Sequence, residues 1–157
     1  MFLKDKKNLS GIIILVLAVF LIWSTFLLVD YFSELATIKT VVINGQKIEV
    51  ELAKTNEQKI LGLGQRTSLP LDRGMLFVYS QYLIPAYWMK DMKFPIDIIW
   101  IKDDMVVGYE KNLQPATDNL NLPTYQPKTF INYVLEVKAG WVDQFGVKIG
   151  DGVEINI

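Results

Sequence analysis

The chain has 157 residues, which is enough for one domain and one additional segment, and it carries 16 basic and 17 acidic residues. It contains no histidine and no cysteine, which excludes Ser-His-Asp and Cys-His catalysis, disulfides and every zinc site built on those ligands. Residues 30–157 carry 13 basic and 16 acidic side chains, hence a net charge of −3, and no basic stripe. We therefore expect no nucleic-acid partner, no metal and no other cofactor.

A long apolar segment lies near the N-terminus. Residues 11–29 form a run of 19 residues without a charge. As a helix that rises about 1.5 Å per residue, the run reaches roughly 28 Å, close to the ~30 Å hydrocarbon core of a bilayer. A buried core helix would show a polar stripe, whereas only Ser24 and Thr25 interrupt this run. The sequence therefore predicts a transmembrane helix over residues 11–29.

The charges that flank this segment predict its orientation. Three lysines precede it (Lys4, Lys6 and Lys7), and two acidic residues, Asp30 and Glu34, follow it. The positive-inside rule places the N-terminus in the cytoplasm and the rest of the chain outside. A cleaved signal peptide is the competing interpretation, but its apolar region is typically about 7–15 residues long and ends in a small-x-small site, which is missing here.

We therefore expect an uncleaved signal anchor with a single pass through the cell membrane. Residues 1–10 form the cytoplasmic N-terminus, residues 30–39 a short connector, and residues 40–157 an extracytoplasmic domain. The membrane is thus the first predicted partner.

Local patterns in the domain predict one hairpin and one short helix. Asn44-Gly45 stands between two apolar runs and predicts a hairpin of residues 40–43 and 46–52, because a type I′ turn needs positive φ at both central positions. Thr55 and Gln58 have the spacing of a capping box, which predicts a helix of about two turns that ends near Gly62 or Gly64.

The remaining segments favour a mainly β domain. A helical turn or two is expected within 139–145, and 112–128 is expected to be irregular. Further strands are predicted at 75–79, 86–89, 96–101, 105–109, 131–137 and 153–157. Short strands separated by frequent turns indicate a β-sandwich or a barrel with one or two short helices.

Two carboxylates interrupt apolar strands. Asp97 lies within the segment 94–100, and Glu136 lies within 133–137. A buried acid is costly unless it is paired or hydrogen-bonded. One interpretation is structural: each acid accepts hydrogen bonds from a loop or pairs with Arg66 or Arg73. The other is functional: both acids line one pocket, in which Arg66 binds an anion or Lys90 donates a proton.

A second candidate feature is the apolar segment around Trp88 and Met89. Thioethers beside a large ring form adaptable surfaces that suit a ligand or peptide groove. Ordinary core filling is the alternative, because buried Met and Trp are common in cores.

From about Val50 to Val153 the chain resembles the family catalogued as domain of unknown function 192. The resemblance rests on motifs in the same order and spacing, and these are Gly62-Leu63 with Arg66 and Leu69, Gly74-Met75-Leu76-Phe77, Trp88-Met89-Lys90, Pro95-Ile96-Asp97-Ile98, Val106-Val107, Tyr133-Val134-Leu135-Glu136, Gly140-Trp141 and Gly150-Asp151. The chain departs from the family pattern at two places. Asp91-Met92 replace an Asn-Thr pair, and Gly64 replaces a Met.

This resemblance implies a compact β-sandwich of jelly-roll type and frequent export, and it implies no assigned activity. Carried over residue by residue, the pattern gives eight candidate ligand-binding residues. They are Arg66, Met75, Trp88, Met89, Lys90, Asp97, Glu136 and Asp151.

Three functions follow as hypotheses. The first is a membrane-tethered module that binds a small molecule or a peptide. The second is an interaction or assembly domain of the cell envelope, which a large exposed apolar patch without a concave pocket would favour. The third is a hydrolase of an envelope polymer with Asp97 and Glu136 as acid and base, which needs both carboxyl groups on one face, about 5–9.5 Å apart. An enzyme is the less expected outcome, because no nucleophile motif is present.

Overall fold

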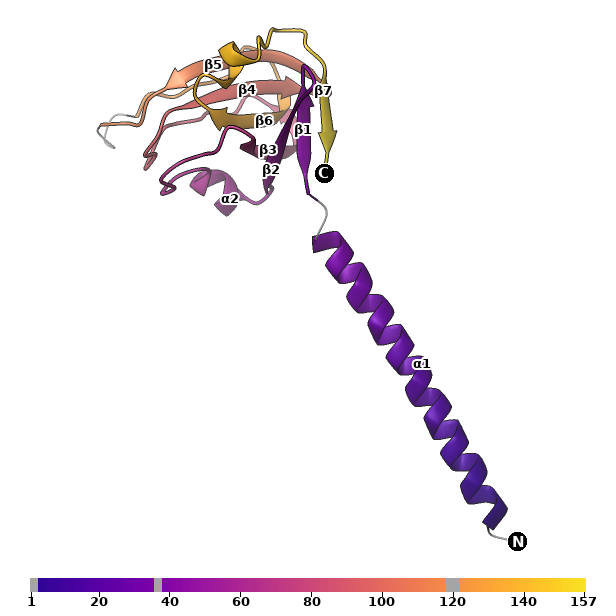
Figure 1. Ribbon diagram of the computed structural model, residues 1–157. Coiled ribbons are helices and arrows are strands. Elements are labelled where there is room, and N and C mark those ends of the chain that lie inside the picture. The colour runs from indigo at the N-terminus through magenta and orange to yellow at the C-terminus, as the bar shows by residue number, and fades with distance from the viewer. Residues whose placement is uncertain (1–2, 36–37, 118–121) are drawn as a thin grey trace. The chain divides into compact units, whose positions relative to one another are not determined.

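The computed structural model describes residues 3–35, 38–117 and 122–157, and the chain divides into two compact units, Met1–Thr37 and Ile38–Ile157. The first unit is helix α1 (Leu3–Leu35), shown in Figure 1. Its segment Ile12–Asp30 is long and apolar enough either to cross a membrane or to serve as a signal sequence. The helix continues to Leu35, so most of the predicted connector is helical.

The second unit is a mainly β domain with one curled sheet, shown in Figure 1, and two short helices, α2 and α3. The sheet order is β5-β4-β6-β3-β2-β1-β7. The elements are β1 (Thr40–Ile43), β2 (Gln46–Ala53), α2 (Asn56–Leu61), β3 (Arg73–Leu83), β4 (Ile96–Lys102), β5 (Met105–Leu113), β6 (Ile131–Lys138), α3 (Trp141–Gln144) and β7 (Val153–Asn156).

The sheet curls until its two ends approach each other. An isolated bridge joins Met105 at the start of β5 to Gly152 just before β7, and the Val106 amide donates to the Asp151 carbonyl at 2.9 Å. The result is a half-barrel. The predicted mainly β class and its short helices are confirmed, and the sandwich is an approximation of this single curled sheet.

One pair of strands is parallel. Strands β2 and β3 run in the same direction, with Glu51 opposite Met75, whereas the other pairs of named strands are antiparallel. A parallel pair needs a crossover, because the chain must return to the end of the sheet from which it started. Residues 54–72 form this crossover, and they include α2.

Both faces of the sheet are covered by apolar side chains. One cluster includes Ile99, Leu135 and Val137 with Trp141 of α3, and the other includes Phe77 and residues of the crossover and of the loops. Strand β4 contributes to both clusters, so Ile96–Ile101 are all buried. This explains why β4 is an uninterrupted apolar run rather than an alternating one.

Several local predictions are confirmed. Asn44 and Gly45 have φ values of +52° and +74°, as the predicted hairpin turn requires. Thr55 caps α2 in a capping box with Gln58, and Gly62 ends the helix with its amide bonded to the Gln58 carbonyl at 2.9 Å. The predicted strand at 86–89 is wrong. That segment forms only an isolated bridge between Tyr87 and Tyr125.

Candidate functional site

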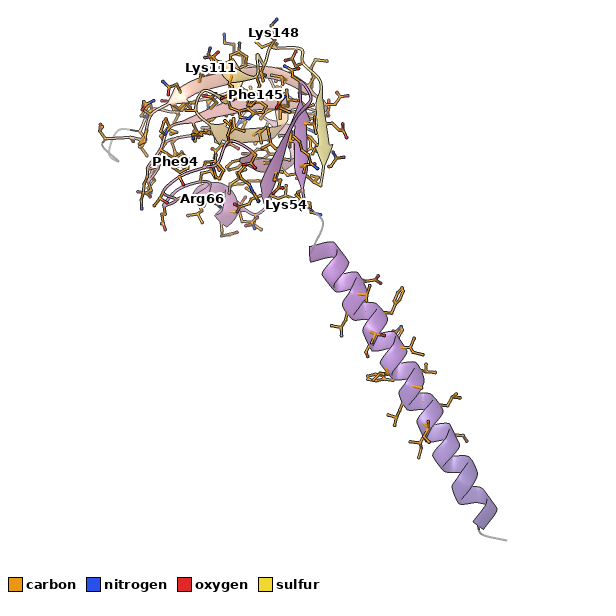
Figure 2. The ribbon with its side chains drawn as sticks, viewed as in Figure 1. Lys54, Arg66, Phe94, Lys111, Phe145 and Lys148 are labelled. Atoms are coloured by element: carbon orange, nitrogen blue, oxygen red, sulfur yellow. The ribbon has the colours of Figure 1, made fainter. Side chains whose placement is uncertain are left out.

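A pocket of about 290 Å³ lies between the crossover and the loop that follows β3. Residues 59–64 of the crossover form one wall, and residues 86–92 form the other. Strands β3 and β6 supply the floor, with Phe77, Tyr79 and Glu136. Figure 2 shows Arg66 on the side of the domain where α2 lies, and Lys111 and Phe145 on the opposite side.

The floor of the pocket carries a buried carboxyl group without a hydrogen-bonding partner. Glu136 is 5% exposed, and its Oε2 atom has no partner in the described structure. Its neighbours in the same row of the sheet are Met75 on β3 and Ile98 on β4, neither of which can stabilise a charge. Burial raises the pKa of Glu136 to about 8, although the nearby charge of Arg66 acts in the opposite direction. The carboxyl group is therefore mostly protonated at neutral pH.

Gly62, at the end of α2, lies beside this carboxyl group. A Cβ atom at Gly62 would lie 3.9 Å from Oε2 of Glu136 and 3.5 Å from Cζ of Phe77. Those distances are ordinary contacts, but Gly62 has a φ of +50°, which a side chain rarely adopts. The glycine is therefore required by the backbone turn at the end of α2.

Four aromatic residues line the same pocket. The rings of Phe77 and Tyr87 meet edge to face with centroids 5.0 Å apart, and the hydroxyl groups of Tyr79 and Tyr87 lie 2.9 Å apart. One phenol therefore donates to the other, and burial raises the pKa of both. Trp88 is 41% exposed at the pocket. The rings make the wall largely apolar.

Two lysines are the other charged side chains of the pocket. Lys59 lies on α2, which the capping box starts, and its Nζ atom is 4.2 Å from the centroid of the Tyr79 ring. Burial lowers the pKa of Lys59. Lys90 comes from the facing loop. The lining therefore combines two cationic groups with one carboxyl group that is mostly uncharged.

Arg66 is near the pocket but is already paired. Its guanidinium forms a bidentate ion pair with Glu51 of β2, in which Nη2 lies 2.8 Å from Oε2. The pair raises the pKa of Arg66 and lowers the pKa of Glu51. Glu51, Met75 and Glu136 lie in one row across β2, β3 and β6, so the charge of Arg66 acts on Glu136 without a hydrogen bond.

Asp97 has a structural role on the other face of the sheet. Its register partner on β6 is Val137, whereas Glu136 pairs with Ile98, so the side chains of Asp97 and Glu136 point to opposite faces. Asp97 is fully buried and accepts three backbone N–H bonds, from Asn112 at 2.8 Å, Gly140 at 3.2 Å and Val142 at 2.9 Å.

This geometry removes the hydrolase that pairs Asp97 with Glu136, because that mechanism needs both carboxyl groups on one face. Over the described residues, no group of three or more Asp or Glu side chains is placed to hold a metal ion.

Some of the other residues predicted to bind a ligand line the pocket, and the rest have structural roles. Trp88, Lys90 and Glu136 line the pocket together. Met89 is buried in the apolar cluster that also contains Phe77 and Tyr87 of the lining. Asp151 holds a turn far along the chain, where it accepts from Asn44 Nδ2 and from the Lys148 amide, both at 2.8 Å.

Sequence reasoning missed Lys59, Tyr79 and Tyr87. They come from three separate segments, and none stands in a pattern that indicates a site. The only signal was the capping box of α2, which fixes the position of Lys59 on its helix.

The two departures from the family pattern both fall on this pocket. Gly64 and Met92 belong to its lining. A Cβ atom at Gly64 would lie 2.8 Å from the Leu61 carbonyl oxygen, so the backbone there has the shape that glycine permits. These substitutions therefore alter the wall of the pocket and leave the sheet unchanged.

The fold and the pocket define a small domain built on one curled sheet, with a ligand-sized cavity beside a parallel crossover. The chain belongs to the family of domain of unknown function 192, whose model, described as Uncharacterized ACR, matches residues 39–155. The resemblance drawn from the sequence motifs is thereby confirmed.

Two solved structures have a similar fold. A protein from Sinorhizobium meliloti, provisionally described as a transcription regulator, has a TM-score of 0.69 and 29% identity over 76% of this chain and 94% of its own. A protein of unknown function from Novosphingobium aromaticivorans has a TM-score of 0.67 and 28% identity over 73% of this chain and 83% of its own. A comparison with curated proteins found no match.

Proposed function

We propose that this chain is a membrane-tethered extracytoplasmic module that binds a small molecule in the pocket between the crossover and the loop 86–92. The observation that carries the proposal is Oε2 of Glu136, a buried polar atom without a partner on the floor of a cavity. Buried polar atoms are normally hydrogen-bonded, and an exception at a pocket points to a missing partner. A ligand supplies that partner.

The tether is the second half of the proposal. Helix α1 contains an apolar segment of membrane-spanning length, and the three lysines Lys4, Lys6 and Lys7 precede it. The positive-inside rule then leaves the domain outside the cytoplasm. Alkaline phosphatase fused after Ile157 should be active, and N-terminal sequencing of the membrane-bound protein should start at the initiator region. An inactive fusion, or a mature chain that begins after Val29, would overturn the tether.

Binding is tested on the full chain in lipid nanodiscs. Native mass spectrometry and a thermal-shift screen of small molecules should find a bound species. Ala86→Trp, which fills the pocket from an exposed position, should abolish binding. Gln81→Trp, at an exposed position of β3 outside the pocket lining, is the matched control and should bind normally. A folded protein that shows no bound species and no thermal shift would contradict the proposal.

A partner-docking domain is the second candidate, because apolar side chains are exposed around the pocket. Ile60, Leu61 and Trp88 are 68%, 56% and 41% exposed. The presence of a concave pocket favours the small ligand over this candidate. Photo-crosslinking from Leu61 in intact cells separates the two. A single recurrent crosslinked protein would favour docking, and the absence of one would leave the binding module as the function.

A further inference from the structure

The charges of the pocket limit the chemistry of its ligand. Its charged lining residues are Lys59, Lys90 and Glu136. The charge of Arg66 also reaches Glu136, although Arg66 is itself paired with Glu51. With the carboxyl group protonated, the field in the cavity is positive. A free cation is repelled from this pocket, and an anion is attracted to it.

The carboxyl group needs an acceptor. A protonated carboxyl group has one O–H donor, and no hydrogen bond in the described structure satisfies Oε2 of Glu136. The phenols of Tyr79 and Tyr87 are bonded to each other, and the lysines are donors only. None of these groups is hydrogen-bonded to Glu136 in the described structure, so a bound ligand can supply the acceptor.

The walls limit the rest of the ligand. Phe77, Tyr79, Tyr87 and Trp88 present ring surfaces to a cavity of about 290 Å³. This volume lies just below the usual range for small-molecule sites, about 300–1,000 Å³. It suits a compact apolar body, such as one aromatic ring, with a single charged group.

We propose that the pocket binds a small anion with a compact apolar body, whose anionic group accepts a hydrogen bond from the Glu136 carboxyl group and is neutralised by Lys59 and Lys90. This inference rests on the proposed function, and it specifies the class of ligand. Charge-assisted O–H···O⁻ bonds are short and strong, so one such bond can hold the anion at the floor of the pocket. An ammonium ligand is the opposite case, because it would require an ionised Glu136 and would meet the two lysines.

Three probes with the same ring separate these cases. They are para-fluorobenzoate, para-fluorobenzylamine and para-fluorobenzyl alcohol, measured by ligand-observed fluorine NMR on the full chain in nanodiscs. Near pH 6.5 the benzoate should bind at least about tenfold more tightly than the other two. By about pH 9 its affinity should fall about tenfold, because the pKa of Glu136 is about 8 and ionisation removes the donor.

Variants assign the effect to Glu136. Glu136→Gln keeps a donor and should bind the benzoate with little remaining dependence on pH, whereas Glu136→Leu should weaken binding at least about tenfold near pH 6.5. A fall in benzoate affinity between about pH 6.5 and about pH 9 that is as large in Glu136→Gln as in the wild type would contradict the assignment to Glu136. Glu110→Gln, a carboxylate on β5 outside the pocket lining, should behave as the wild type.

The inference is overturned if the amine binds most tightly, if benzoate binding is unchanged in Glu136→Leu, or if none of the three probes binds. The proposed function is judged separately, by the mass-spectrometry and thermal-shift screen. A ligand found there that is cationic or neutral would refute the anion and leave the binding module intact.

Discussion

Replacing Glu136 with glutamine should change how the stability of the domain depends on pH. In the folded protein the carboxyl group keeps its proton until the pH reaches about 8, whereas its ordinary pKa is 4.5. Between these values the unfolded chain releases a proton that the folded chain retains. Stability should therefore fall as the pH rises from 4.5 to about 8, and it should level off above that range.

The magnitude follows from the same two pKa values. The pKa of Glu136 is 4.5 in the unfolded chain and about 8 in the folded one. Each pH unit between these values is worth about 1.4 kcal/mol, so raising the pH across the interval lowers the free energy of unfolding by about 5 kcal/mol. Glutamine has no proton to release, so Glu136→Gln should match the wild type near pH 4.5 and exceed it by about 5 kcal/mol near pH 8.

Urea unfolding of the full chain in nanodiscs, followed by tryptophan fluorescence at several pH values, measures this difference. Few other groups titrate between pH 4.5 and about 8. The protein has no histidine, and the pKa values of Glu51, Glu57 and Asp151 are lowered, so these carboxyl groups titrate below this interval. Glu154→Gln, at an exposed position of β7, should keep the wild-type slope. A wild-type stability that is flat from pH 5 to 8, or an equal slope in Glu136→Gln, would refute the reasoning.

Three further predictions concern the sheet and the charges beside the pocket. Asp97→Asn should cost about 2–4 kcal/mol in urea unfolding, because an amide N–H₂ group would face backbone donors that now share a carboxylate. Gly74→Ala should cost a similar amount, about 2–4 kcal/mol, since its Cβ would lie 2.8 Å from the Glu136 carbonyl oxygen. Gly152→Ala, which meets nothing within 4 Å, is the control and should change stability by less than about 0.5 kcal/mol. Arg66→Gln should raise the pKa of Glu136, because the Arg66 charge lowers it, and a carbon-detected NMR titration of the side-chain carboxyl group would show the shift. A pKa that stays unchanged or falls would contradict that placement of the charge.

The sequence predicted most features that depend on neighbouring residues. The Asn44-Gly45 turn, the Thr55 cap and the helix end at Gly62 involve contacts within a few positions, and all three are present. The strand expected at 86–89 failed because its apolar residues cover the sheet from a loop, and composition alone does not distinguish these environments.

The candidate site was harder to predict, because it depends on register between distant strands. Asp97 and Glu136 have the same apolar surroundings in the sequence, yet one pairs with Val137 and the other with Ile98. A difference of one position puts one carboxyl group among backbone amides and the other on the floor of a pocket. No local pattern gives that register. Lys59 and Tyr87 were not identified because they come from a helix and a loop that only the tertiary fold brings to the pocket.

The parallel pairing of β2 with β3 has a practical consequence for redesign. Because the chain must return between these strands, one wall of the cavity is formed by the crossover and not by a strand. The floor with Glu136, in contrast, is carried by the strands. Substitutions at the wall positions Lys59, Ile60 and Leu61 therefore change what faces the cavity without altering a strand.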